Sequence, residues 1–109
     1  MEKSNIKALF IVVNAGFAET AVEIARENGA GGATILNARG SGLIHKSIMG
    51  ITVDTEKEMV LTLVDKEKSE RIIAAIKQRA GVGSPVNGIC FVMPVDRMTG
   101  MADSSDLTL

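Results

Sequence analysis

The order of apolar segments in this chain predicts an α+β fold of the ferredoxin-like type. Four short apolar runs alternate with two stretches of helical periodicity, in the order strand, helix, strand, strand, helix, strand. Two right-handed strand–helix–strand halves joined in this way form a four-stranded antiparallel sheet with both helices on one face. The length of 109 residues fits one domain. We expect that domain over residues 4–100, followed by a tail of residues 101–109.

The first half begins with a buried strand. Residues 6–13 form a continuous apolar run rich in β-branched side chains, which is typical of a strand buried on both faces. Asn14 is expected to cap a helix over residues 15–27, because its side-chain oxygen can accept a backbone N–H. The apolar residues of that helix fall at helical spacing, and Asn28 with Gly29 provides the stop.

The middle of the chain is rich in glycine. A second strand is expected over residues 33–38, with glycine clusters before and after it. Residues 40–55 contain three glycines and no sustained period, so we expect most of this segment to be a loop. A third strand is expected over residues 58–64, where the sequence EMVLTLV is again apolar.

The second helix and the last strand complete the pattern. Asp65 is placed to cap a helix over residues 66–80, and Gly81 ends it. Residues 81–88 form a second glycine-rich loop, and residues 88–95 are expected to be the fourth strand. Neither face of this strand looks solvated, because residues 89–93 are all apolar. With only two helices available to cover the sheet, the sequence therefore predicts self-association.

Composition argues against several functions. The net charge of −1, with three Phe and no Trp or Tyr, argues against nucleic-acid binding, which needs a basic surface and stacking platforms. A single Cys90 cannot form an internal disulfide, so we expect a reduced cytoplasmic protein. No apolar run reaches the ~18 residues of a membrane span, so no direct membrane insertion is expected. The sequence also contains no catalytic constellation, and no enzyme activity is expected.

Several short motifs, taken in order, resemble the PII (nitrogen regulatory protein P-II) signal-transduction family. The segment 32–34 and the following Arg39-Gly40-Ser41-Gly42 are similar to that family's second strand and its exit into the long T-loop. The segment 63–65 resembles the end of its third strand. Residues 81–94 resemble its B-loop and following strand, and residues 97–100 its C-terminal Arg-Thr-Gly segment. The resemblance covers roughly residues 7–100.

The resemblance implies a homotrimer that binds adenine nucleotides in clefts between subunits, with no other cofactor required. Glycine-rich turns suit phosphates because their backbone N–H groups form anion-binding concavities. The implied adenosine pocket is at residues 32–34 and Leu63, and the implied phosphate contacts are at Gly40, Gly42 and the 81–88 loop. The nucleotide-binding residues are expected to be Gly32, Ala33, Thr34, Gly40, Ser41, Gly42, Leu63, Val64, Gly81, Val82, Gly83, Ser84, Asn87, Gly88 and Arg97.

The sequence also departs from the family pattern. Ile89 stands where a phosphate-contacting Lys is expected, and Leu43 stands where a basic residue is common. Each charge-assisted contact is worth about 1.5–3 kcal/mol, so these losses penalise a triphosphate most. We therefore expect AMP or ADP to be preferred over ATP. The T-loop is shortened and lacks Tyr, which excludes uridylylation, and no response to 2-oxoglutarate is expected.

The expected function is that of a regulator. Nucleotide binding would order the T-loop, and the loop would dock on a partner, possibly a membrane transport protein, in an order–disorder switch. The expected partner-binding residues are Leu43, Ile44, His45, Lys46 and Ser47. The alternative is a structural or metal-linked trimer resembling the divalent-cation tolerance proteins, without nucleotide binding. No metal site is expected, because His45 has no Cys or second His near it in sequence.

Overall fold

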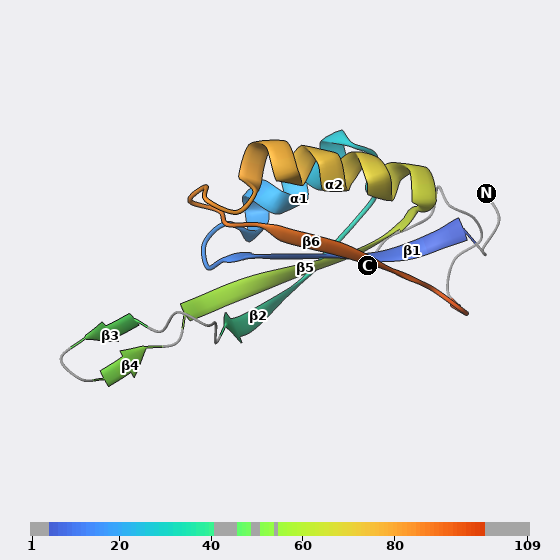
Figure 1. Ribbon diagram of the computed structural model, residues 1–109. Helices are drawn as coiled ribbons and strands as arrows, with labels where there is room; N and C mark the ends of the chain where they lie inside the picture. Colours follow the sequence, from blue (N-terminus) through green and yellow to red (C-terminus); the bar gives the residue numbers. More distant parts are fainter. Residues whose placement is uncertain (1–4, 41–45, 49–50, 54, 100–109) are drawn as a thin grey trace.

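The computed structural model, which describes residues 5–40, 46–48, 51–53 and 55–99, has the predicted ferredoxin-like fold. Its four-stranded sheet has the order β2-β5-β1-β6, and all neighbouring strands are antiparallel. Both helices lie on one face of this sheet (Figure 1). The bounds of these elements are β1 Ile6–Asn14, α1 Ala18–Glu27, β2 Thr34–Gly40, β5 Thr55–Asp65, α2 Lys66–Ala80 and β6 Ile89–Pro94.

The segment expected to be mostly loop contains a small hairpin. Strands β3 (Lys46–Ile48) and β4 (Ile51–Val53) pair with each other, with Ile48 opposite Ile51. Figure 1 shows this hairpin beyond the ends of β2 and β5, away from the helices. The sequence reading missed it because three-residue strands are too short to produce a periodic pattern, although Ile, Thr and Val favour strands.

The expected cap of the first helix was wrong. Asn14 is the last residue of β1, and α1 begins at Ala18 after Phe17, whose side chain makes no capping bond. Glu58 of β5 takes this role instead, because its Oε1 accepts hydrogen bonds from the N–H groups of Gly16 (2.6 Å) and Ala18 (3.4 Å). A carboxylate from a neighbouring strand thus satisfies the helix N-terminus, where negative charge is favoured.

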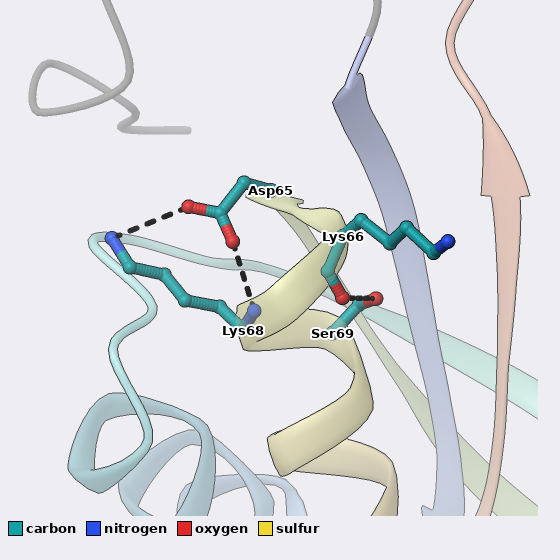
Figure 2. Close-up of polar contacts among 4 residues, drawn as sticks. All are labelled: Asp65, Lys66, Lys68 and Ser69. Atoms are coloured by element: carbon teal, nitrogen blue, oxygen red, sulfur yellow. Dashed lines mark hydrogen bonds and ion pairs between the residues drawn. The ribbon is translucent and has the colours of Figure 1, made fainter. Parts of the chain in front are cut away.

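The expected cap of the second helix is confirmed. Asp65 Oδ1 accepts a hydrogen bond from the N–H of Lys68 at 2.8 Å (Figure 2). The Lys68 ammonium lies 4.0 Å from Asp65 Oδ2, and the Ser69 hydroxyl donates to the carbonyl of Lys66 at 2.6 Å. The first turn of α2 is therefore fixed by its own side chains. The helix ends at Gly81, as predicted.

Replacing Asp65 tests this cap. We expect Asp65→Ala to lower the free energy of unfolding by about 0.5–2 kcal/mol, because it leaves a helix N–H without its acceptor. Asp65→Asn keeps a side-chain oxygen at the same place and should stay within a few tenths of a kcal/mol of the parent protein. Urea denaturation at neutral pH measures both values. Equal losses in the two variants would contradict the capping role.

The core lies between the helices and one face of the sheet. Fully buried side chains of the sheet meet fully buried side chains of the helices, among them Leu9, Ile11, Val13, Val60, Ile24, Ile72 and Ile76. The strand registers place alternate residues on the opposite face, where Phe10 and Phe91 stack with ring centroids 5.1 Å apart. That face is apolar and uncovered in the single chain: its exposed residues include Leu36, Ile89, Phe91 and Met93.

Candidate functional site

The residues predicted for the adenosine pocket lie together on β2 and β5. The fully buried Thr62 hydroxyl donates to the carbonyl of Gly32 at 2.5 Å. This bond holds the residues just before β2 against β5. Thr34 is exposed and pairs with Leu61, two residues before Leu63. Val64 is only 1 % exposed in the core, so its side chain cannot reach a ligand. The structure therefore leaves Thr34 and Leu63 as the accessible side chains of this group.

The 81–88 loop is compact and held by its own hydrogen bonds. The Ser84 hydroxyl donates to the carbonyl of Gly81 at 2.7 Å and accepts from the N–H of Asn87 at 3.2 Å. The N–H of Gly88 donates to the carbonyl of Ala80 at 2.7 Å. A Cβ at Gly88 would lie 2.6 Å from that carbonyl oxygen, so no larger residue fits there. Gly83 has φ +96°, which favours glycine.

These two groups lie at different levels of one sheet, because Thr34 pairs with Leu61 near the middle of β5 whereas Gly40 pairs with Thr55 at its beginning. Thr34 and Gly40 are the first and last residues of β2, six positions or about 20 Å apart. Gly40 lies at the same end as the 81–88 loop, because Asn14 at the end of β1 binds the carbonyls of Pro85 and Val86. One chain therefore cannot bring both predicted groups to one nucleotide.

Arg97 follows β6, at the end of the sheet where β1 begins. Val95, just after β6, donates its N–H to the carbonyl of Ile6 at 3.2 Å, at the start of β1. This contact puts the chain after β6 at the end of the sheet opposite to the 81–88 loop. The Arg97 side chain is almost fully exposed and lies 3.8 Å from the Asp96 carboxylate. Within one chain it is a surface cation, away from the glycine loop that was expected to contact phosphates.

Lys57 is a cation that the sequence reading missed. Its Nζ donates to Asn14 Oδ1 at 2.6 Å, and a Cβ built on Gly40 would lie 3.1 Å from its Cε. It therefore lies between Gly40 and the residues that hold the 81–88 loop. Lys57 also lines an open hollow of about 710 Å³. The other residues of this hollow are Ala15, Gly16, Asn37, Ala38, Arg39, Glu56 and Glu58.

The predicted partner-binding residues fall mostly outside the described part of the chain. Leu43, Ile44 and His45 are not among the described residues, whereas Lys46 and Ser47 begin β3. Ser41 and Gly42, which were predicted to bind the nucleotide, also lie outside the described residues. Among the residues that the structure describes, no group of three or more His, Cys, Asp or Glu could hold a metal ion. In the same residues, no helix is long and apolar enough to cross a membrane.

Comparison with known protein families identifies the family of this chain. The model of the family described as nitrogen regulatory protein P-II matches residues 6–102, most of the chain. The chain belongs to the P-II family. P-II proteins are signalling proteins rather than enzymes, which agrees with the expectation from the sequence.

Solved structures share the fold of this P-II protein. A PII-like signalling protein of Thermus thermophilus is 26% identical, with a TM-score of 0.65 over 83% of this chain and 86% of that one. Bacillus subtilis GlnK is 20% identical, with a TM-score of 0.69 over 94% and 98% of the two chains. Its ATP complex is also 20% identical, with a TM-score of 0.63 over 84% and 83%. No curated protein sequence matches this P-II chain.

Cys90 of this P-II protein packs against the core from β6. Burial raises the pKa of the Cys90 thiol to about 12. Because the thiolate is the nucleophile, raising the pKa from 9.0 to about 12 lowers the reactive fraction at pH 8 by about a thousandfold.

We expect Cys90 to react far more slowly with a thiol reagent at pH 8 than Val82→Cys in a Cys90→Ala background, since residue 82 is 80% exposed. Equal rates would contradict the burial of Cys90.

Proposed function

We propose that this P-II protein binds an adenine nucleotide between neighbouring copies of a homotrimer and regulates a partner through the β3–β4 segment. One observation supports the shared site most directly: the two groups of predicted ligand residues lie about 20 Å apart in one chain. A second copy is needed to place the predicted adenosine residues at the start of β2 beside the 81–88 loop of a neighbouring chain. The assembly is the one that the family resemblance implies.

The uncovered sheet face supports the trimer. Its exposed apolar residues lie on both edge strands, β2 and β6, and Phe91 is 43% exposed although its ring stacks on Phe10. Full burial of such a side chain is worth about 1.5–3 kcal/mol, and these are already about half buried, so covering each one contributes about 1 kcal/mol and contact between copies through this face is favourable. Closed rings of identical chains repeat one interface, and three copies would cover all three faces.

The ligand we propose is AMP or ADP in preference to ATP. The structure of B. subtilis GlnK with ATP identifies a nucleotide complex in a protein of the same fold. Here Ile89 opens β6 where the family pattern has a lysine, and it is 52% exposed. Lys57 adds a cation at the loop end, so phosphates do not rest on backbone N–H groups alone. One lysine in place of several contacts still favours the less charged nucleotide.

Two measurements test this function. Thermal-shift assays with AMP, ADP, ATP and divalent metals should give shifts with nucleotides and none with metals. Shifts with metals alone would instead support the metal-linked trimer. Calorimetry should then show ADP or AMP binding at least tenfold more tightly than ATP, a difference of about 1.4 kcal/mol. Tighter binding of ATP would contradict the proposed preference.

The proposed partner is a membrane transport protein that the β3–β4 segment contacts from the cytoplasm. The hairpin supports this role because it extends beyond the sheet that would form the trimer (Figure 1). Its docking is expected to depend on bound nucleotide, as in an order–disorder switch. The test is co-purification of a transport protein with the wild-type protein, compared with Lys46→Glu, in the presence and absence of ADP. Identical recovery under all four conditions would contradict this role.

A further inference from the structure

Asn14 joins three segments through its own atoms. Its backbone N–H donates to the carbonyl of Val86 at 2.9 Å, and its Nδ2 donates to the carbonyl of Pro85 at 2.9 Å. Its Oδ1 accepts from Lys57 Nζ at 2.6 Å. The end of β1, the 81–88 loop and the beginning of β5 therefore meet at one side chain.

The chemistry of this junction requires an amide. Lysine offers only donors and a backbone carbonyl only accepts, so Lys57 must face Oδ1 and Pro85 must face Nδ2. The two partners thus fix the orientation of the Asn14 amide. Aspartate keeps the acceptor for Lys57 but has no donor for Pro85. Alanine removes both contacts.

The contacts continue on either side of Asn14. On one side, Lys57 lies against Gly40, and Gly40 pairs with Thr55 at the ends of β2 and β5 from which the hairpin extends. On the other side, Pro85 lies in the 81–88 loop, where the Asn87 N–H donates to the Ser84 carbonyl. The Gly88 N–H then connects this loop to the end of α2 by donating to the Ala80 carbonyl. Asn14 therefore links the loop end of α2 to the strand ends beside the hairpin, next to a backbone hydrogen bond from the Ala15 N–H to the Glu56 carbonyl at 3.2 Å.

We propose that Asn14 is a positioning residue that couples the 81–88 loop to the paired ends of β2 and β5. A change in the position of the loop moves the Pro85 carbonyl. Asn14 must then either lose that contact or release Lys57, and either change alters the strand ends at Gly40 and Thr55. This coupling deepens the proposed function, on which its biological meaning rests, because it gives a ligand at the loop a route to the hairpin.

Hydrogen exchange of the ligand-free protein tests the coupling without any nucleotide. Lys57→Met keeps the apolar stem over Gly40 but removes the donor to Asn14. We expect it to raise exchange of the Asn87 and Gly88 amides about three- to tenfold, although these amides donate to Ser84 and Ala80 and not to Lys57. In an Asn14→Ala background the same substitution should change these two amides less than twofold. Asn28→Ala is the control, because Asn28 caps the end of α1 by donating to Ile24.

Asn14→Asp separates the two contacts of the side chain. It should raise exchange of the Asn87 and Gly88 amides as Asn14→Ala does, while the paired ends of β2 and β5 keep wild-type exchange because Lys57 retains its acceptor. Asn14→Ala should raise exchange at both places. An unchanged loop in Lys57→Met, or the same effect of Lys57→Met in both backgrounds, would overturn the proposal. A residue that only stabilised the fold would raise exchange throughout the sheet.

Adding ADP separates this inference from the proposed function. Because the proposed phosphate contacts include Gly40 and Lys57, ADP should slow exchange at the loop and at the ends of β2 and β5 in the wild-type protein and in Asn14→Ala alike. The ligand-free exchange, and not the response to ADP, therefore decides the coupling. If calorimetry detects binding of neither AMP nor ADP to the wild-type protein, the proposed function is contradicted, and the ligand-free exchange still decides the coupling.

Discussion

Phe91→Glu is expected to convert the trimer into single chains and to abolish nucleotide binding with it. Phe91 lies on the uncovered face of the sheet, where its ring stacks on Phe10 and its exposed part would be buried by a neighbouring copy. The substitution removes apolar burial and places a charge in the interface. Together these effects cost about 4 kcal/mol per interface, which weakens association about a thousandfold.

Val92→Glu is the matched control for this experiment. Val92 is the next residue of β6 and is 38% exposed, similar to Phe91, but it pairs with Leu9 and so points to the helix side of the sheet. We expect Val92→Glu to remain a trimer. Analytical ultracentrifugation at micromolar concentration measures both variants. A monomeric wild-type protein, or a Phe91→Glu variant that stays trimeric, would contradict the proposed interface.

Thr34→Trp and Lys57→Glu are each expected to weaken ADP binding by at least about a hundredfold, or roughly 2.7 kcal/mol. Tryptophan would fill the space beside β2 where we propose that the adenosine binds. Glutamate replaces Lys57, the cation of the proposed phosphate site, with a negative charge that repels the phosphates. Thr34 pairs with Leu61, which is four positions or about 13 Å along β5 from Lys57, so the two substitutions act at separate places of one chain. Ile35→Trp, on the other face of β2, and Lys66→Glu, at the start of α2, are the controls.

Both variants must remain trimers for the comparison to hold, and ultracentrifugation checks this. Thr34 is exposed, so a larger side chain there does not disturb the core. Lys57 is paired with a neutral amide rather than with a carboxylate, so its replacement leaves no buried charge behind. Wild-type affinity in either variant would contradict the assignment of that residue to the site.

The fold was predictable because each element carries its own signal. The apolar run of β1, the Asp65 cap of α2 and the glycine stops at Gly29 and Gly81 are local features that need no knowledge of neighbours. The uncovered sheet face also followed from the sequence, because the apolar residues of β6 alternate onto both faces and the two helices can cover only one.

The candidate site was less predictable because it depends on how the strands pair in the sheet. The register that brings Lys57 opposite Asn14 and beside Gly40 is a property of three strands, and no local pattern encodes it. Asparagine is a residue type that often caps helices. The side chain of Asn14 instead forms hydrogen bonds with Lys57 and the Pro85 carbonyl, and Glu58 caps α1 from a distant strand. Long-range partners therefore overrode the local preference of Asn14.

Mixing the two defective variants tests most directly whether each nucleotide site is built from two copies of the chain. Thr34→Trp and Lys57→Glu are unfolded together, refolded as mixed trimers and titrated with ADP. In a cyclic trimer each mixed assembly regains one site with both halves intact, so about a quarter of all sites should bind ADP with wild-type affinity. If the mixture binds no better than either variant alone, the shared site is contradicted.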